Sequence, residues 1–354
     1  MTKEPILTYS SDALFGIDKL ISQKPTNACP VIGCNEKTES GGKFTICRRH
    51  GLEIHKSTFV YYNGNSRDDK KKARLRNLLL FGGEDFVTKH ILDNGHKAES
   101  YRLGYENSED ALTWNIFGGL LYYERLHQVY NQLTGANSSS NQLELFLWGL
   151  KIDFSAQQTE TWAPLMKVRK HLEKDIKRFF TEPDIMILGP EHLVCIEAKF
   201  TSGNTLVLKG KPDRESEKPT SREGLIERYI RRNKMWNPPV ITPEELGEKI
   251  HSQLLRMLVF TSTMAQLEKR KWIVANLIST TQWDKKNNKS RGYDFDDPTP
   301  SIPASVRNNF KFISWEYDIY ENILKHDSAL VELSAYMKNK TANLKKAFKL
   351  PDSG

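Results

Sequence analysis

The sequence contains few cysteines and no long apolar run, and both absences exclude large classes of protein. The chain has only four cysteines in 354 residues and no signal sequence, which argues against a protein held together by disulfide bonds. No stretch reaches the roughly 18 apolar residues that a membrane-spanning helix needs. The opening segment, Met1–Ile6, also lacks the basic start and apolar core of a signal peptide. We therefore expect a cytoplasmic protein that has no membrane partner.

The composition is that of a soluble globular protein with a basic balance. Hydrophobic residues make up 38% and charged residues 27%, which is enough apolar material for a core. A chain of 354 residues has room for one large domain with appendages or for two domains. The 52 lysines and arginines outnumber the 44 acidic residues, which gives a net charge of +8. Such an excess favours a polyanionic partner such as nucleic acid, although a basic protein without that partner can have the same composition.

Three of the four cysteines lie close together in the sequence, which indicates a metal site rather than disulfide bonds. Cys29 and Cys34 enclose a turn, so both sulfurs can meet at one point. Cys47 and His50 have the spacing of one helical turn and project to the same side. Together they offer a Cys₃His set for tetrahedral Zn²⁺, and the arrangement resembles a treble-clef-type zinc finger. Cys195, within an apolar run, is expected to be a small core residue.

Three points about this zinc module, residues 1–60, stay open at the level of the sequence. His55 is an alternative to His50 as the fourth ligand, and the cysteines can also be reduced residues of a small core without metal. Basic residues, among them Arg48 and Arg49, sit between the ligands. They are suited to contact phosphates, but the zinc site can equally be structural alone.

Two apolar runs in the middle of the chain predict a β-hairpin. Ile185–Leu188 and Leu193–Ile196 are separated by a Gly-Pro-Glu segment, a combination typical of a tight turn. If Pro190-Glu191 forms a two-residue loop, Gly189 faces His192. The register of the hairpin can then be counted outward from the loop.

This register puts Asp184 opposite Glu197 at the open end of the hairpin. Because side chains alternate along a strand, Lys199 shares a face with Glu197, and Ala198 points the other way. Two carboxylates and one ammonium would then meet at one place. Carboxylate oxygens are suitable ligands for Mg²⁺, and the lysine can hold a water beside the metal. The alternative is a surface hairpin with an ordinary cross-strand ion pair.

The residues Pro183-Asp184 and Glu197-Ala198-Lys199 resemble the signature of the PD-(D/E)xK nuclease superfamily. The resemblance implies an α/β fold with a restriction-endonuclease-like αβββαβ core, in which helices flank a mixed central sheet. It also implies that Asp184, Glu197 and the carbonyl oxygen of Ala198 bind a catalytic Mg²⁺. Lys199 would orient the attacking water. Residues 105–280 carry this resemblance.

The resemblance further implies an additional acid from the first core helix, and Glu109 fits that place. Ser108 is a good N-cap for this helix, and Leu112 and Ile116 belong to its apolar stripe. Glu109 lies three residues before Leu112 and seven before Ile116, hence on the same inward face. Glu106 is the competing choice. Glu109 can also be an ordinary first-turn acid that stabilises its helix.

A second helix is predicted after the hairpin, beginning at Pro243 with Thr242 as its N-cap. Its apolar stripe includes Ile250 and Leu254, and Gln253 lies on the inward side of that stripe. Some families of the superfamily carry a supporting polar residue, often glutamine, on this helix. Gln253 is therefore a candidate for the catalytic site. A plain buried glutamine that is bonded to the backbone is the alternative.

The predicted elements follow the order helix, strand, hairpin, helix, strand that the resemblance implies. Leu143–Phe154 supplies the strand before the hairpin, and Lys271–Ser279 supplies the buried strand at the end. An additional helix over Trp162–Phe180 departs from this order. We assign a catalytic domain with basic insertions to residues 61–300, and C-terminal helices packed on the core to residues 301–354.

Two basic segments are candidates for contact with DNA. The predicted helix Asp68–Leu80 carries lysines and arginines close to Tyr61 and Tyr62, and Arg222–Trp236 interleaves arginines with aromatic residues. Such a composition suits a phosphate backbone, but each segment can equally be a solvated helix face. Thr201–Arg222, rich in Gly, Pro, Ser and charge, is predicted to be a long loop or insertion.

These patterns lead to the hypothesis of a Mg²⁺-dependent, sequence-specific endonuclease for double-stranded DNA, similar to a type II restriction enzyme. A two-fold homodimer would supply two active centres for the two antiparallel strands. A repair, recombination or transposon-linked nuclease of the same fold is the first alternative. The second alternative is a zinc-containing DNA-binding protein in which the hairpin acids are merely structural.

Overall fold

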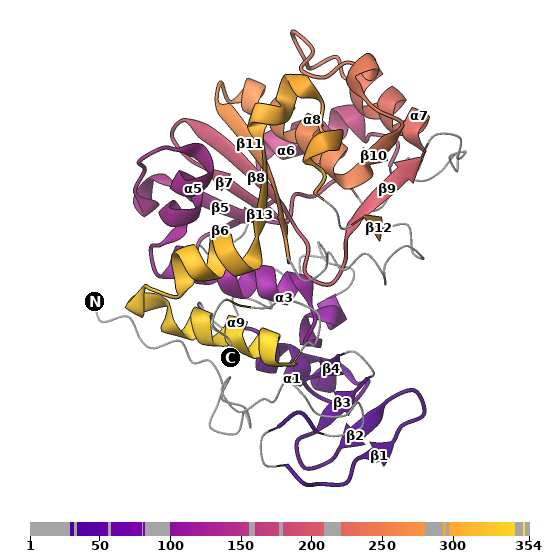
Figure 1. The fold of residues 1–354 in the computed structure, drawn as a ribbon, viewed down its shortest axis with the longest axis vertical. Coiled ribbons are helices and arrows are strands. Elements are labelled where there is room, and N and C mark those ends of the chain that lie inside the picture. Colours follow the sequence, from indigo (N-terminus) through magenta and orange to yellow (C-terminus); the bar gives the residue numbers. More distant parts are fainter. Residues whose placement is uncertain are drawn as a thin grey trace.

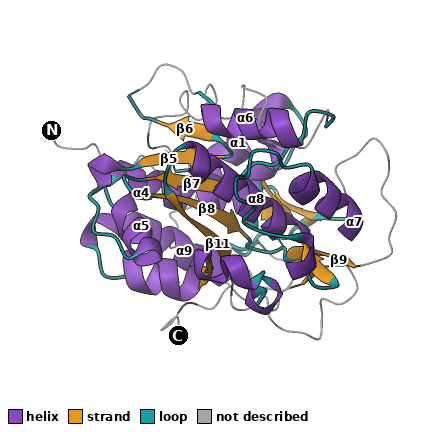
Figure 2. Ribbon diagram, turned by 90° about the horizontal axis from the view of Figure 1, so that it is seen from above, coloured by secondary structure: helices purple, strands orange, loops and turns teal. Residues whose placement is uncertain are grey.

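A six-stranded mixed β-sheet lies at the centre of the protein, with helices on both faces (Figure 1, Figure 2). The computed structural model describes residues 29–31, 34–55, 58–79, 81, 100–155, 160–176, 180–208, 221–279, 293–294, 297–343 and 350. From one edge to the other, the strands are β13 (Phe310–Ser314), β11 (Lys271–Ile278), β8 (His192–Ala198), β7 (Ile185–Leu188), β5 (Glu144–Leu147) and β6 (Leu150–Ile152). The three strands β8, β11 and β13 run parallel, whereas β8, β7, β5 and β6 pair antiparallel.

Helices cover both faces because the central strands carry apolar side chains on both sides. Along β8, Val194 and Ile196 belong to one hydrophobic cluster, whereas Leu193 and Cys195 belong to the other. The first cluster is covered by α3 (Glu109–Thr113), η4 (Trp114–Gly118), α4 (Gly119–Tyr122), α5 (Leu126–Thr134), η11 (Trp315–Leu324) and α9 (Val331–Asn343). The second is covered by α6 (Ala163–Leu172), α7 (Arg222–Leu225), η6 (Ile226–Arg231) and α8 (Ser252–Leu267). The predicted α/β class with a mixed, helix-flanked sheet is therefore confirmed.

The central hairpin, β7–β8, has the register that the sequence predicts. Ile185 pairs with Ile196, and the N–H of Gly189 donates a hydrogen bond to the carbonyl oxygen of His192 at 3.0 Å. The two residues between them form the loop. The same register continues one position beyond β7, to the acidic residues of the candidate site.

The segment Leu143–Phe154 is two strands and not the single predicted strand. Strands β5 and β6 are joined by Trp148 and Gly149, whose φ angles are 53° and 84°. Two consecutive positive φ angles are typical of the tight turn of a hairpin. Glycine adopts this conformation readily, but tryptophan does so rarely, so the sequence gives little sign of the turn.

The helix predicted over Trp162–Phe180 ends early, at Leu172. The next residue, Glu173, turns inward and is fully buried. Its carboxylate accepts hydrogen bonds from the N–H of Thr181 at 2.8 Å and from the hydroxyl of Tyr229 at 2.7 Å. The helix therefore ends where the buried Glu173 carboxylate is hydrogen-bonded by residues distant in the sequence. Helical periodicity does not reveal such long-range contacts.

The helix predicted from Pro243 begins only at Ser252. Thr242 does form the predicted cap together with Glu245, but the element that it caps, η7 (Pro243–Glu245), is a single 3₁₀ turn. The cap signal was correct and the length of the helix was wrong. Part of the segment between η7 and α8 forms a β-strand.

A small three-stranded sheet contains that strand, in the order β10 (Lys249–His251), β9 (Asn204–Leu208) and β12 (Tyr293–Asp294). Ile250 pairs with Val207, so it belongs to the strand and not to the apolar stripe of the helix. Strand β9 also occupies part of the loop predicted over Thr201–Arg222. Residues 209–220 of that loop lie outside the described residues.

A second antiparallel sheet lies near the N-terminus, with β1 (Glu39–Ser40), β2 (Thr45–Cys47), β3 (Leu52–Ile54) and β4 (Phe59–Val60) in sequence order. It encloses a hydrophobic cluster of its own, which includes Cys29, Leu52 and Phe59. Helix α1 (Arg67–Asn77) follows, close to the predicted Asp68–Leu80. Leu80 and residues 1–28 of the predicted zinc module lie outside the described residues.

Candidate metal centre and active site

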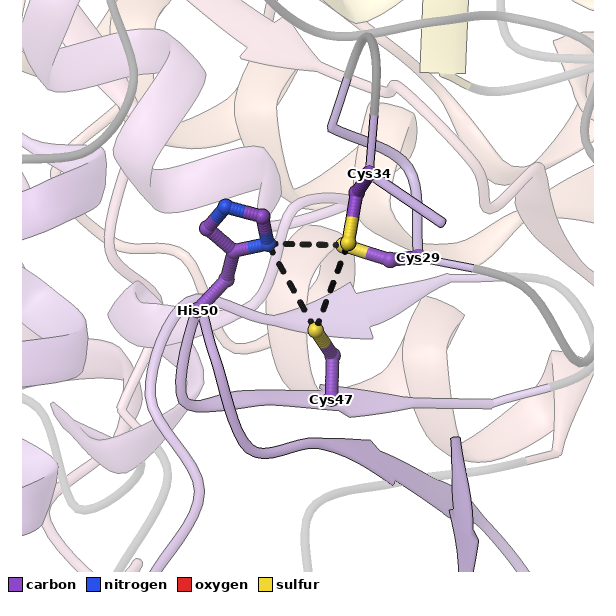
Figure 3. A group of neighbouring side chains, drawn as sticks. All are labelled: Cys29, Cys34, Cys47 and His50. Carbon is purple, nitrogen blue, oxygen red and sulfur yellow. Dashed lines mark hydrogen bonds between the residues drawn. The ribbon is translucent and has the colours of Figure 1, made fainter. Parts of the chain in front are cut away.

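The three clustered cysteines and His50 come together in the structure (Figure 3). Their ligand atoms all lie within 4.8 Å of one another, and all four side chains are buried. Nδ1 of His50 is 3.2 Å from Sγ of Cys29 and 3.5 Å from Sγ of Cys47, and the sulfurs of Cys34 and Cys47 are 3.9 Å apart. Three thiols and one imidazole at one point are the donor set of a structural zinc site, so the group is a candidate metal site compatible with zinc.

His50, and not His55, is the fourth member of this group. Cys47 ends strand β2 and His50 lies in the turn that follows, so the predicted spacing holds although the backbone is not helical. Nε2 of His55 lies 2.7 Å from Oε1 of Glu53. The alternative ligand is therefore wrong, because that imidazole is engaged with a carboxylate outside the group. Cys195 is a buried residue of strand β8, as predicted.

Arginine side chains near the candidate metal site are partly used for internal contacts. Arg76 of helix α1 donates hydrogen bonds to the carbonyl oxygens of His50, at 3.0 Å, and Tyr61, at 2.8 Å. Arg48 pairs with Glu39 at 2.7 Å on the surface. Arg76 thus connects helix α1 to the candidate metal site. Its contact with DNA phosphates stays a prediction, as it does for the other basic residues of the helix.

A polar cleft of about 700 Å³ opens at the end of the central hairpin. It contains all five side chains that the sequence singles out as catalytic: Glu109, Asp184, Glu197, Lys199 and Gln253. Further lining residues are Thr58, Arg102, Tyr105, Asn107, Ser108, Asp110, Trp148, Phe180, Thr181, Glu182, Thr201, Ser202, Arg256 and Met257. Sequence reasoning missed this second group, because its members come from separate segments without a common pattern.

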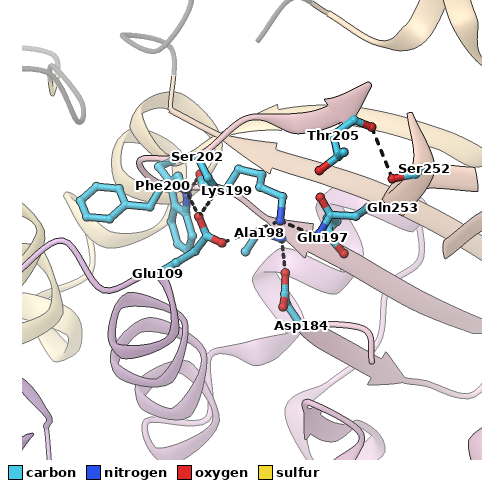
Figure 4. Close-up of polar contacts among 11 residues, drawn as sticks. Glu109, Asp184, Glu197, Ala198, Lys199, Phe200, Ser202, Thr205, Ser252 and Gln253 are labelled. Carbon is cyan, nitrogen blue, oxygen red and sulfur yellow. Dashed lines mark hydrogen bonds and ion pairs between the residues drawn. The ribbon is translucent and has the colours of Figure 1, made fainter. Parts of the chain in front are cut away.

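The hairpin residues lie together at one end of the sheet (Figure 4). Nζ of Lys199 is 2.7 Å from Oε1 of Glu197, and the two residues are only 5% and 4% exposed. Oδ2 of Asp184 accepts a hydrogen bond from the N–H of Ala198 at 2.9 Å. The predicted convergence of two acids and one lysine is therefore present in the geometry, at the edge of the cleft rather than on an open surface.

Glu109 reaches the same place from the start of helix α3. Ser108 caps that helix, since its side chain accepts a hydrogen bond from the N–H of Ala111. Oε1 of Glu109 is 3.7 Å from Nζ of Lys199. Glu106 lies elsewhere, fully buried, and its Oε1 is 3.7 Å from Nζ of Lys340. Of the two candidate acids, Glu109 is the one that lines the cleft.

Gln253 lies in the first turn of α8, on the face of the sheet opposite to helix α3, which carries Glu109. Its Nε2 donates a hydrogen bond to Oε1 of Glu197 at 2.7 Å. The same oxygen accepts the bond from Lys199. The amide is therefore bonded to a side chain in the cleft, and the alternative of a glutamine that bonds only the backbone does not hold.

The surrounding charges keep Lys199 in its ammonium form. Burial by itself would lower the pKa of this lysine, but the negative charges of Glu197, Glu109 and Asp184 outweigh it and raise the pKa above its ordinary value. Burial raises the pKa of Glu109, an effect that the Lys199 charge and the hydrogen bond from the N–H of Phe200 partly offset. Lys199 is thus held as a positive charge by the three acids Glu197, Glu109 and Asp184.

Comparison with known proteins adds no relative. No family model matches the sequence, and neither a curated protein nor a solved structure is similar to it at a significant level. Within the described ranges, none of the helices has the length and apolar character needed to span a membrane. Function can therefore be inferred only from the geometry of the two sites.

Proposed function

We propose that this protein is a Mg²⁺-dependent endonuclease for double-stranded DNA with an active site of the PD-(D/E)xK type. The observation that carries the proposal is the meeting of Asp184, Glu197 and Lys199 in one cleft. A surface ion pair would be solvated, whereas this lysine and glutamate are almost fully buried. Burial of a charged pair at a cleft is costly to stability and typical of functional sites.

The order of the elements supports the same proposal. Helix α3, strand β5, strands β7 and β8, helix α8 and strand β11 follow one another in the order αβββαβ. Glu109 and Gln253 extend from the two helices of that series, which lie on opposite faces of the sheet. Strand β6, helix α6 and the segment from β9 to η6 would be additions to the core. This agreement favours a restriction-endonuclease-like core over an unrelated mixed sheet.

The residues of the cleft have separate roles in the proposed hydrolysis. Asp184, Glu197 and the carbonyl oxygen of Ala198 would hold Mg²⁺, which prefers hard oxygen ligands. Lys199 and Gln253 both donate their hydrogen bonds to Oε1 of Glu197. The other oxygen, Oε2, accepts no hydrogen bond from any described residue. When bound, Mg²⁺ supplies Lewis-acid chemistry that offsets negative charge at the scissile phosphate and makes water more acidic.

Lys199 and Glu109 have separate parts in this scheme. The ammonium of Lys199 attracts the scissile phosphate and orients the attacking water. Glu109 accepts a hydrogen bond from the N–H of Phe200 at 2.7 Å. It therefore holds in place the segment directly after strand β8, which carries Lys199. Its charge also helps to keep the lysine protonated. We further propose Zn²⁺ in the group of Cys29, Cys34, Cys47 and His50, where it would stabilise the N-terminal sheet.

Cleavage of supercoiled plasmid and mixed-sequence linear DNA in Mg²⁺ tests the proposal. Asp184→Asn and Lys199→Met should each lower the cleavage rate by at least about a hundredfold and leave DNA binding in a gel-shift assay intact. Asp175→Asn, at an exposed acid outside the cleft, is the matched control and should cleave at the parent rate. Parent-like cleavage by either cleft variant would show that the assignment is wrong.

The products separate the proposed restriction-like enzyme from the alternatives. Discrete bands with uniform ends indicate sequence-specific cleavage by a homodimer, whose two-fold axis matches that of duplex DNA. Smears, or cleavage that depends on DNA structure, indicate a repair, recombination or transposon-linked nuclease. DNA that is bound but left intact in both Mg²⁺ and Mn²⁺ indicates a zinc-containing DNA-binding protein.

A further inference from the structure

Asn276 is a buried amide that the contacts described so far do not explain. It lies in strand β11 and is 0% exposed. Neither its Oδ1 nor its Nδ2 has a hydrogen-bond partner among the described residues. A buried polar group that stays unpaired destabilises the folded protein. Such groups are rare in proteins, and each one needs an explanation.

The position of Asn276 in the sheet suggests why its amide is unpaired. Strand β11 pairs with β8 so that Asn276 lies directly beside Glu197, at the strand spacing of about 5 Å. Ala275 and Leu277 pack in the cluster that contains α3, whereas Val274 packs in the cluster that contains α8. Because side chains alternate, Asn276 faces the α8 side. Residues in register share a face, so the amide and the carboxylate point the same way.

Three polar side chains therefore form a row across neighbouring strands. Asp184 stands one position before β7, opposite Glu197 in the hairpin register, and Asn276 stands on the other side of Glu197. Lys199 and Gln253 both bond Oε1 of this carboxylate. Oε2 is the oxygen that remains for a cation, and the unpaired amide lies next to the same carboxylate.

We propose that Asn276 is a positioning residue for the proposed Mg²⁺ site. Its amide orients the Glu197 carboxylate through one ordered water, so that Oε2 stays turned toward the cation. The inference rests on the proposed function. Carboxylates that bind metals are commonly held by such outer hydrogen bonds, and the loss of one typically lowers metal affinity by roughly 10–100-fold. The unpaired amide is then a stability cost that an active site retains.

Replacement of Asn276 by leucine separates this role from a purely structural one. Leucine has the same number and branching of heavy side-chain atoms and no polar group, so Asn276→Leu should fold with a free energy of unfolding equal to or higher than that of the parent. The dissociation constant for Mg²⁺ should nevertheless rise about tenfold. Calorimetric titration of the full chain with MgCl₂ measures the affinity, and urea denaturation measures the stability. Asn276→Ser, which keeps a hydroxyl and leaves space for a water, should have intermediate affinity.

Thr261→Val is the matched control. Thr261 is also 0% exposed and its hydroxyl has no hydrogen-bond partner among the described residues, but it lies further along α8 and does not line the cleft. Valine has the same shape, so this variant also removes an unpaired polar group. Its stability should change in the same direction as that of Asn276→Leu, and its Mg²⁺ affinity should equal that of the parent.

The outcomes distinguish the inference from the proposed function. A parent protein that binds Mg²⁺ and cleaves DNA, with Asn276→Leu equal to it in Mg²⁺ affinity, overturns the inference and leaves the function standing. If Asn276→Leu does not fold, parent-like affinity of Asn276→Ser overturns the inference in the same way. A parent protein that neither binds Mg²⁺ nor cleaves DNA overturns the proposed function itself.

Discussion

Glu109 is tied to the backbone of Phe200, whose N–H donates a hydrogen bond to Oε2 of the carboxylate at 2.7 Å. The hydroxyl of Ser202 donates to the same oxygen at 2.9 Å. The start of helix α3 is thereby connected to the chain that leaves strand β8, directly after Lys199. Glu109 is thus part of the frame of the cleft as well as an acid that faces it.

We predict that Glu109→Ala lowers the free energy of unfolding by about 1–3 kcal/mol, because the N–H of Phe200, a fully buried residue, loses its acceptor. Glu109→Gln keeps one acceptor oxygen and should lose less. Urea denaturation measures both, and hydrogen exchange of the Phe200 amide should become faster in the alanine variant. Glu223→Ala, at an exposed first-turn acid of α7, is the control for a general helix-dipole effect. Equal losses at Glu109 and Glu223 would contradict the specific role of Glu109.

The buried pair of Glu106 and Lys340 predicts a stability that depends on pH. Burial raises the pKa of Glu106 from 4.5 to about 7, although the Lys340 charge opposes the shift. Burial lowers the pKa of Lys340 from 10.5 to about 8, and the Glu106 charge opposes that shift. Between pH 4.5 and 7 the folded state holds more protons than the unfolded state, so stability should fall as pH rises. Between pH 8 and 10.5 the unfolded state holds more protons, so stability should rise again.

Removal of the lysine should therefore be costly in a pH-dependent way. Lys340→Met leaves the Glu106 carboxylate buried without its partner and should cost about 3–5 kcal/mol at pH 8. The loss should be smaller at pH 5, where the carboxyl can take up a proton. The double variant Glu106→Gln/Lys340→Met should recover most of the loss at pH 8. Lys338→Met, at an exposed lysine of the same helix, should change stability by less than about 0.5 kcal/mol. A loss that is the same at both pH values would rule out the titration of Glu106.

Metal removal should loosen more than the N-terminal sheet. The N–H of Tyr61 donates to the carbonyl oxygen of Gly104 at 3.0 Å, and the N–H of Glu106 donates to that of Phe59 at 2.9 Å. Strand β4 is thus bonded to the segment that leads into Ser108 and helix α3. Small metal sites commonly fold only with their metal. Chelation, or Cys47→Ser, should therefore speed hydrogen exchange at the Tyr61 and Glu106 amides.

The main sheet supplies the internal reference for this measurement. The N–H of Lys199 donates to the carbonyl oxygen of Leu277 at 2.7 Å, within the six-stranded sheet, and its exchange should stay slow. Unchanged exchange at Tyr61 after complete metal removal would mean that the cysteine cluster holds the N-terminal sheet together without metal.

Arg256 is the residue of the cleft that we expect to contact a DNA phosphate. It lies one turn after Gln253 on helix α8 and lines the cleft. In the described part of the chain it forms neither a hydrogen bond nor an ion pair. Arg256→Ala should weaken DNA binding uniformly across sequences and reduce the slope of log K against log salt by about one. Arg307→Ala, at an exposed arginine outside the cleft, should leave that slope unchanged, and an unchanged slope for Arg256→Ala would exclude the contact.

Local patterns were sufficient for the parts of the site that lie on one hairpin or one turn. The register of β7 and β8 follows from the length of the loop, and strand alternation then puts Glu197 and Lys199 on one face. The spacing of Cys47 and His50 brings both ligands to one point even though the backbone there is a turn. Ser108 caps its helix as the sequence predicts, because capping involves only the next few residues.

Only the tertiary structure decided what depends on contacts between distant segments. The sequence favoured Glu109 but left Glu106 as a competing choice, and the fold buries Glu106 against Lys340 and turns Glu109 toward Lys199. It also shortened the helix that carries Gln253, because the residues before Ser252 pair with strand β9 instead. Helical or strand preference is a short-range property, whereas these outcomes are set by which buried charge, donor or strand edge lies across the core.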